Sequence, residues 1–425
     1  MPSRHAAAPP GFHERITGVD NARSSRIGPV EFVGLMATLT ALIALSIDMI
    51  LPALPAIGAA LRVRQANDTQ FVISLLFLGF GLGQFLYGPV SDSVGRKPTV
   101  YAGLALFAAG CTLSLAAQTF PVMLAGRVLQ GLGVAGPRTM TIALVRDKFE
   151  GHLMARVMSF VMAVFILVPV IAPSLGQVVL AVSSWRAIFG VYLTLSLAVL
   201  VWFGWRQEET LPAARRRAFS AATIAIAARE VFTHRVALGY TLAAGLMYGA
   251  FIGYLTSVQQ ILQQQYALAA RFPLYFATLA ISLGTASLCN ARLVGRYGMR
   301  RLSSWAVRLV ALVSIPFAAV AISRSGQPEL WALMLYLMAA FFGIGLLFGN
   351  LNALAMQPLG HIAGTGAAVV GGLQTLISLT LGTAIGQSYD GTVVPLVVGF
   401  AILSVLAMIA MHWAEPSRAV GLQAT

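Results

Sequence analysis

Twelve apolar runs, each about as long as a membrane-crossing helix, constrain the fold of this chain more than any other feature. A spanning helix needs about 20 apolar residues. Of the 425 residues, 58% are hydrophobic and 10% are charged, against about 25% charged in a globular domain. We therefore predict an all-α membrane protein. The expected spans are 31–53, 70–90, 99–117, 121–145, 157–180, 185–205, 236–258, 272–294, 302–323, 329–356, 366–389 and 392–413.

An internal repeat predicts two pseudo-symmetric six-helix bundles. Glycine and arginine residues around Gly95, after the second run, recur around Gly298, after the eighth. The longest polar gap between runs follows the sixth. Such paired halves are typical of transporters, whose substrate path lies between them at mid-membrane. The predicted parts are a tail over 1–30, a bundle over 31–205, a linker over 206–235, a bundle over 236–413 and a tail over 414–425.

The net charge of +14 has two interpretations, nucleic-acid binding and membrane topology. With the N-terminus inside, the inner segments hold 20 lysines and arginines and the outer segments hold 5. Positive charge on inner loops sets the orientation of membrane proteins. We therefore favour the topological interpretation and expect both termini in the cytoplasm, with no nucleic-acid partner.

Motifs for other chemistry are missing from the sequence. It has no Gly-x-x-x-x-Gly-Lys-Ser/Thr nucleotide loop and no His-Glu-x-x-His or Cys-x-x-Cys metal spacing. Cys111 and Cys289 lie in separate apolar runs, so we expect no disulfide. We predict no cofactor, no metal, no nucleotide and no enzymatic activity; a membrane-embedded enzyme is an alternative that would need a reactive polar cluster. Uphill transport would then use an ion gradient.

The loop after the second run is the most specific motif. Its glycines permit tight turns, its aspartate can accept hydrogen bonds at a helix N-terminus, and its basic pair is held on the inner side. A simple positive-inside hairpin would not require the aspartate or both glycines. The candidate residues for a cytoplasmic gate are Gly88, Asp92, Gly95, Arg96 and Lys97.

This loop resembles the Gly-x-Leu-x-Asp-Arg-x-Gly-Arg-Lys signature of the major facilitator superfamily. Val90 replaces the leucine and Ser93 replaces the first arginine. The resemblance extends over all twelve runs. It implies that the loop gates the cytoplasmic side, with Asp92 near the start of the eleventh helix at about 364–366. The missing arginine removes part of that charge network.

Asp48 is the acidic residue that lies well within a predicted span. A carboxyl group kept from water can load and release a proton near neutral pH, which proton coupling requires. The alternative is a hydrated cap near the outer surface beside Pro52. The segment Ser46-Ile-Asp-Met-Ile-Leu-Pro-Ala-Leu-Pro55 resembles drug–proton antiporters, and closely the Bcr/CflA drug-resistance subfamily. The resemblance implies that Asp48 carries the proton.

The run over 121–145 contains Arg127 and Gln130, which resemble the Arg-x-x-Gln-Gly motif that the family is thought to use in proton transfer. A mid-membrane arginine costs about 2.5–3.5 kcal/mol on insertion scales, so it should face a cavity or a partner. Arg127 is therefore a candidate for proton coupling, and a structural arginine bound to carbonyl groups is the alternative.

The run over 157–180 resembles the Gly-Pro-x-x-Gly-Gly antiporter motif. It keeps Pro173 and Gly176, and Pro169 precedes them, whereas Ala172 and Gln177 replace glycines. Proline and glycine bend a membrane helix. We expect a kinked, closely packed helix at the domain interface, and the motif favours export over import.

Several polar residues are candidates for substrate binding. Arg138 lies eleven residues after Arg127 and therefore on the same helix face. It could attract an anionic group, or it could extend to the cytoplasmic surface and pair with Asp147. The asparagines below could bind substrate or join helices. The candidates are Gln130, Arg138, Tyr248, Tyr254, Asn350, Asn352 and Gln374.

These observations predict a secondary active exporter of the bacterial inner membrane that exchanges protons for an outward-moving small compound by alternating access. By resemblance, the cargo is a drug or another hydrophobic organic compound, and the protein is a monomer. The alternative is a proton-coupled transporter of a specific small, possibly anionic, metabolite. Arg138 favours this alternative, and the segments around Asp48 and Gly176 oppose it.

Overall fold

The computed structural model describes residues 27–415, and these form a helical membrane protein. The predicted tails over 1–30 and 414–425 therefore lie mostly outside the described residues. Eleven stretches of the described chain are long and apolar enough to span a bilayer, and one of these joins two helices, so there are twelve long helices. They are α1 (Pro29–Asp48), α3 (Phe71–Val94), α4 (Arg96–Leu115), α5 (Phe120–Lys148), α6 (Gly151–Val182), α7 (Trp185–Arg206), α9 (Arg235–Gln259), α10 (Phe272–Tyr297), α11 (Met299–Ser323), α12 (Leu330–Met356), α13 (Ala363–Gln387) and α14 (Val394–Ala414).

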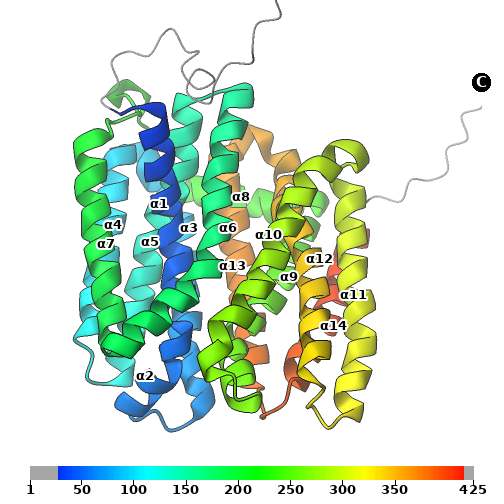
Figure 1. The fold of residues 1–425 in the computed structure, drawn as a ribbon. Helices are drawn as coiled ribbons and strands as arrows, with labels where there is room; N and C mark the ends of the chain where they lie inside the picture. The colour runs from blue at the N-terminus through cyan, green and yellow to red at the C-terminus, as the bar shows by residue number, and fades with distance from the viewer. Residues whose placement is uncertain (1–26, 416–425) are drawn as a thin grey trace, which may run out of the picture.

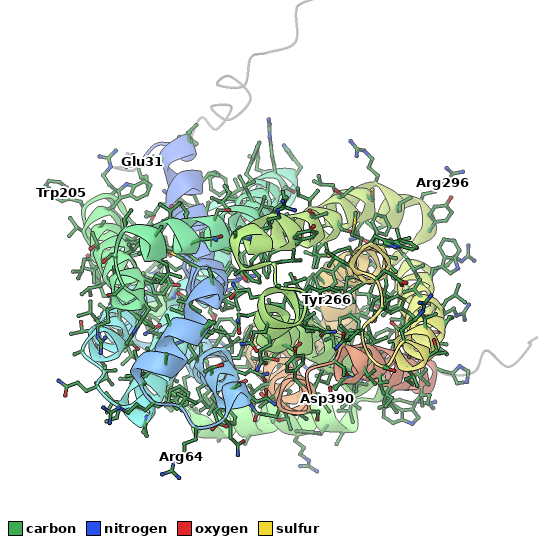
Figure 2. All side chains as sticks on the ribbon, turned by 60° about the horizontal axis from the view of Figure 1, so that its bottom comes forward. Glu31, Arg64, Trp205, Tyr266, Arg296 and Asp390 are labelled. Atoms are coloured by element: carbon green, nitrogen blue, oxygen red, sulfur yellow. The ribbon has the colours of Figure 1, made fainter. Side chains whose placement is uncertain are left out.

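The twelve helices form two groups of six. Figure 1 shows α1 and α3–α7 on one side and α9–α14 on the other. The halves meet where α3 packs on α13 and α6 packs on α10. The predicted fold class, an all-α membrane protein of two six-helix bundles, is confirmed. Figure 2 shows charged residues such as Arg64 and Arg296 at the edge of the protein, where water or lipid headgroups can solvate them.

The first span is broken near its middle. Proline lacks an N–H group, so Pro52 and Pro55 cannot donate to the carbonyl groups one turn earlier. Accordingly, α1 ends at Asp48 and a 3₁₀ turn over Leu51–Ala53 leads into the short helix α2 (Leu54–Ala60). The break leaves backbone carbonyl groups available to other donors beside Asp48.

Glycines let the helices of the first half pack backbone to backbone. A methyl group built at Gly131 of α5 would overlap the carbonyl oxygen of Leu76 on α3, and one at Gly79 would overlap that of Val128. Small residues at helix interfaces allow such close approach in membranes. The α3–α5 contact is therefore tight enough to fix the depth and rotation of α5, which carries Arg127.

The predicted linker contains a helix that the sequence analysis missed. Helix α8 (Ala221–Thr233) begins at Ser220, whose side chain accepts a hydrogen bond from the Thr223 N–H at 3.3 Å. It lies across the long helices rather than along them (Figure 1) and packs on α9 and α13. Its Glu230 pairs with His361 at 2.8 Å. The segment is thus attached to the second half.

Candidate functional site

Asp48 lies at the break in the first span, where α1 ends. Its side chain is buried, with the residue 4% exposed. Among the described ion pairs none involves Asp48. Tyr192 of α7 and Tyr254 of α9, one from each half of the protein, lie within electrostatic range of its carboxyl group. Removing an unpaired carboxylate from water is costly, and binding a proton removes that charge.

Arg127 joins three helices around this break. It is fully buried. Its Nε donates to the Val72 carbonyl on α3 at 2.7 Å, and its Nη2 donates to the Ser46 carbonyl on α1 at 2.9 Å. The Ser46 carbonyl precedes Asp48 by two residues. Arg127 therefore binds the backbone at the end of α1 and not the carboxyl group of Asp48. It can affect Asp48 only by fixing the position of this backbone and through the electrostatic field of its charge.

Gln130 completes this network. Its side-chain oxygen accepts from Arg127 Nη1 at 2.7 Å, and its amide nitrogen donates to the Gly110 carbonyl and to Ser114 Oγ on α4. The residue is fully buried. Gln130 thus lies in the core of the first half with both amide atoms occupied, which leaves it no free group for a substrate.

Helix α6 packs directly on the broken segment of the first span. It runs unbroken through Pro169 and Pro173, and Gly176 follows on a buried turn. A methyl group at Gly176 would overlap the carbonyl oxygen of Met49. The glycine of the antiporter-like motif is therefore the residue that lets α6 approach the backbone next to Asp48.

The predicted gate residues form a charge cluster at the end of the protein opposite α2. Arg96 donates to Asp92 at 2.6 Å and to Asp147 at 3.2 Å. The Asp92 carboxylate accepts from Arg96, and no described hydrogen bond joins it to the start of α13. Gly88, one turn earlier, packs on that helix, since a methyl group there would lie 3.6 Å from the Ala368 Cβ.

Glu209 of the linker caps α4, a contact that the sequence analysis did not predict. Gly95 takes φ +111° between α3 and α4. The Glu209 carboxylate then accepts from the backbone N–H groups of Arg96 (2.9 Å) and Lys97 (3.0 Å). Lys97 Nζ donates to the Gly204 carbonyl at 2.9 Å. The linker therefore supplies the acceptor for the N–H groups at the start of α4.

Replacing Glu209 with alanine should lower the free energy of unfolding of this half by about 0.5–2 kcal/mol, because two N–H groups at a helix start lose their acceptor. Thermal unfolding of the purified protein in detergent would measure the loss. Glu150→Ala is the matched control, since Glu150 precedes α6 without capping it through its side chain. Equal midpoints for the two variants would contradict this role.

A polar cluster joins the two halves at the end of the protein that holds α2. Asn67 donates to the carbonyl groups of Gln387 (3.0 Å) and Tyr389 (2.8 Å) and accepts from Gln260 at 2.9 Å. Gln70 also donates to Gln260. We call Asn67, Gln70, Gln260 and Gln387 the amide cluster. It ties the start of α3 to the ends of α9 and α13.

The other predicted binding residues separate into two kinds. Asn350 of α12 is buried and donates to Asn290 of α10 at 2.7 Å, while Asn352 is exposed. Tyr254 and Gln374 are buried, and the Tyr254 hydroxyl and the Gln374 side-chain nitrogen have no hydrogen-bond partner in the described chain. Asn350 and Asn290 thus join two helices. Tyr254 and Gln374, in contrast, each have a polar group that could bind a substrate.

Aromatic side chains surround Tyr254 and Tyr248 on α9. The Tyr254 ring packs edge-on against Phe341 at 4.6 Å between centroids, and the Tyr248 ring lies 4.6 Å from Phe348. The Tyr248 hydroxyl donates to the Phe348 carbonyl at 3.2 Å. This face of the second half thus offers flat apolar surfaces.

Arg138 faces the same region from α5. It does not pair with Asp147, whose carboxylate accepts from Arg96 and from Thr210 Oγ1. Its guanidinium instead lies over the Phe165 ring, 5.7 Å from the centroid, and within electrostatic range of Tyr248. The ion pair between Arg138 and Asp147 that the alternative predicted is therefore not formed.

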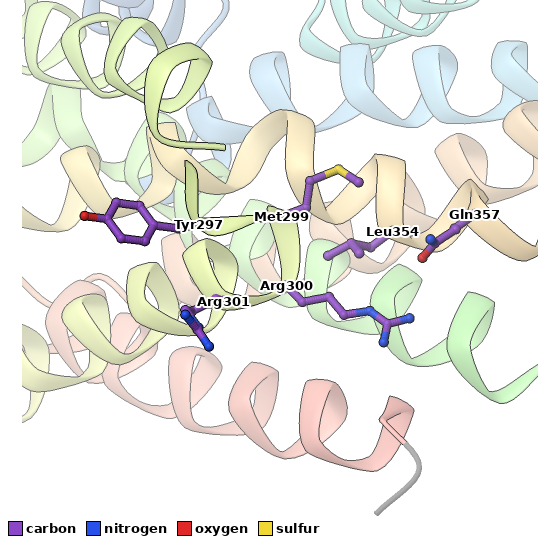
Figure 3. Close-up of a pocket in the computed structure, with 7 residues that line it drawn as sticks. Tyr297, Met299, Arg300, Arg301, Leu354 and Gln357 are labelled. Carbon is purple, nitrogen blue, oxygen red and sulfur yellow. The ribbon is translucent and has the colours of Figure 1, made fainter. Parts of the chain in front are cut away.

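A separate pocket of about 440 Å³ lies at the end of the second half opposite α2. It is formed by the turn between α10 and α11 and by the end of α12. Figure 3 shows Arg300 extending toward the side where Gln357 lies, while Tyr297 points away. None of the predicted binding residues lines it.

Comparison with known proteins agrees with this architecture. The family model described as Major Facilitator Superfamily matches residues 36–383, so the chain belongs to the major facilitator superfamily. It is 25% identical over 393 residues to the bicyclomycin resistance protein homolog of Haemophilus influenzae, covering 90% of this chain and 95% of that protein. It is 26% identical over 371 residues to multidrug resistance protein D of Escherichia coli, covering 84% and 89%.

Among solved structures, a D-xylose-proton symporter has a similar fold, with a TM-score of 0.71 and 15% identity over 92% of this chain and 98% of that one. The predicted resemblance to the superfamily is confirmed by the family model, which covers the segments around Asp48 and Gly88. The names of the two relatives agree with the resemblance to the Bcr/CflA subfamily.

Proposed function

We propose that this protein is a proton-coupled exporter of drugs or other small hydrophobic organic compounds. The observation that carries the proposal is the buried carboxyl group of Asp48, which has no ion-pair partner among the described residues and lies at a helix break between the halves. A proton that binds there changes the charge at the end of α1, where α6 packs on the break and Tyr254 of α9 lies within electrostatic range. The relatives named for drug resistance support the export of such compounds.

Transport would proceed by alternating access, with the bundles over 31–205 and 236–413 rocking about the central path and residues 206–235 linking them. The amide cluster would hold the outer side closed. Asp92, Arg96 and Lys97 would control the cytoplasmic side, together with the glycines Gly88 and Gly95. Arg127 would act as a positioning residue for the Asp48 segment.

The positive charge on the inner segments supports a location in the bacterial inner membrane with both termini in the cytoplasm. Protons would move inward as cargo moves outward. One charge that crosses 100 mV supplies about 2.3 kcal/mol, or nearly fiftyfold in concentration. We propose that the protein works as a monomer without a cofactor and is not an enzyme. Import of a specific metabolite has less support, because two of the relatives that match most of the chain, those from Haemophilus influenzae and Escherichia coli, are named for resistance.

The direct test is accumulation of a panel of dyes and phenicol-type drugs in cells that express the protein and in cells with an empty vector. We expect lower accumulation in expressing cells, and we expect an uncoupler of the proton gradient to remove the difference. Equal accumulation across the panel, or extrusion that resists the uncoupler, would contradict the proposal.

Asn67→Ala should favour the outward-open form, because it removes three hydrogen bonds between the halves, each worth about 0.5–1.5 kcal/mol. The measurement is the labelling rate of a cysteine at Ser74, which is buried below the amide cluster, by an impermeant maleimide applied from outside. Cys111 and Cys289 would first be replaced. Asn352→Ala, an exposed amide, is the control, and equal rates in the two variants would contradict the role of the cluster.

A further inference from the structure

Arg138 has no acidic partner among the residues that the structure describes. No described ion pair or hydrogen bond involves its side chain, and its Nη1 is enclosed without a partner. By contrast, Arg127 on the same helix donates through all three of its nitrogens. An enclosed polar group without a partner is costly and calls for an explanation.

Contact with water at the membrane surface does not explain why the Arg138 side chain has no hydrogen-bond partner. Ten residues separate it from Lys148 at the end of α5, which places its backbone about 15 Å inside that end. A side chain that snorkels extends its charged head into water, whereas here part of the guanidinium is enclosed between α5 and its neighbours. The acidic residue on the last turn, Asp147, is already bound by Arg96.

The surroundings of Arg138 come from both halves and are aromatic. Phe165 of α6 lies beneath the guanidinium, and Tyr248 of α9 lies within electrostatic range. The Tyr248 hydrogen is already donated to the Phe348 carbonyl. Arg138 therefore supplies N–H donors and charge, and Phe165 supplies a flat apolar surface next to it. Tyr248, with Phe348 packed against its ring, supplies more such surface on the side of the second half.

We propose that Arg138 binds the anionic group of the cargo, and that the transported compounds include amphipathic organic anions, such as aryl carboxylates. A guanidinium can hold a carboxylate through two parallel hydrogen bonds, and the aromatic residues pack against the apolar body of the compound. The inference rests on the proposed function, because it places this binding site on the path between the two halves.

This assignment has a consequence for charge movement. When one proton enters as one organic anion leaves, two positive charges move inward in net terms, whereas exchange for a neutral compound moves one. A membrane potential negative inside therefore drives export of the anion more strongly than export of its neutral analogue.

The test is binding of a panel of aryl carboxylates, each paired with its own neutral carboxamide, to the purified full-length protein in detergent. The panel includes 2-naphthoate with 2-naphthamide. We expect the wild type to bind at least one carboxylate about tenfold or more tightly than its carboxamide, in line with a hydrogen bond to a charged group. Arg138→Gln should remove this preference without weakening carboxamide binding, and Arg138→Lys should retain part of it.

Arg308→Gln is the control, since Arg308 is an exposed arginine of α11. Thermal unfolding reports whether each variant is folded, and Arg138→Lys keeps the test decisive if Arg138→Gln does not fold. A wild type without preference for any carboxylate, or a preference unchanged in Arg138→Gln or fully kept in Arg138→Lys, would overturn the assignment. If the protein extrudes neutral drugs in an uncoupler-sensitive way but binds no carboxylate preferentially, this inference is refuted and the proposed export stands. If it binds a carboxylate preferentially but extrudes no compound in an uncoupler-sensitive way, the proposed export is refuted instead.

Discussion

Asp48→Asn is expected to abolish proton-driven extrusion while the protein remains folded and inserted. The amide has nearly the shape of the carboxyl group, but it cannot bind and release a proton. Asp48 is buried at the end of α1, next to the contact of α6 with Met49, and no described ion pair would be broken by the change. The measurement is uncoupler-sensitive extrusion of a transported dye from cells that express equal amounts of wild type and variant.

The matched control for this prediction is Asp390→Asn. Asp390 is exposed in the loop before α14 and accepts hydrogen bonds from Thr392, so its loss should leave extrusion close to that of the wild type. Extrusion by Asp48→Asn that stays sensitive to the uncoupler would remove Asp48 from the coupling role and direct attention to another group.

Gly176→Val is expected to have the second large effect, on stability as well as on transport. Even a single methyl group at this position overlaps the Met49 carbonyl oxygen, which is backbone and cannot swing away. Overpacking a tight contact typically costs about 1–3 kcal/mol. Because the clash falls next to Asp48, α6 must separate from the broken first span. Thermal unfolding in detergent and dye extrusion would both report the change.

Gly190→Ala is the control for Gly176, because a methyl group at Gly190 of α7 meets its nearest neighbour, the Leu115 Cδ1, at an ordinary 3.7 Å. Alanine also favours a helix over glycine by about 1 kcal/mol. We expect this variant to unfold at or above the wild-type temperature. If Gly176→Val matched it in both stability and extrusion, the close approach of α6 to Met49 would have no functional importance.

The spans could be predicted from the sequence because a bilayer demands about 20 apolar residues for each crossing. The predicted limits agree with the helices to within a few residues in most cases; the run over 185–205, for example, corresponds to Trp185–Arg206. Hydropathy did not reveal the break after Asp48, although Pro52 and Pro55 carried the signal. It also missed α8, whose 13 residues are too few for a span.

The partners within the site depend on tertiary contacts, which single-sequence reasoning could not supply. Arg127 was recognised as a residue that needs a partner, but its acceptors, Val72 and Ser46, are backbone groups of two other helices. Glu209 lies in the predicted linker, and its capping of α4 depends on how the linker folds back. The amide cluster joins Asn67 to Gln260 and Gln387, whose pairing nothing in the local sequence indicates.

The central claim, that the carboxyl group of Asp48 couples proton movement to transport, is tested most directly in proteoliposomes that contain purified wild type or Asp48→Asn. The measurement compares two modes of the same protein, uptake of a transported compound driven by an imposed pH gradient and exchange of that compound across the membrane without a gradient. The account predicts that Asp48→Asn loses gradient-driven accumulation and keeps exchange. Accumulation in Asp48→Asn equal to that of the wild type would contradict it.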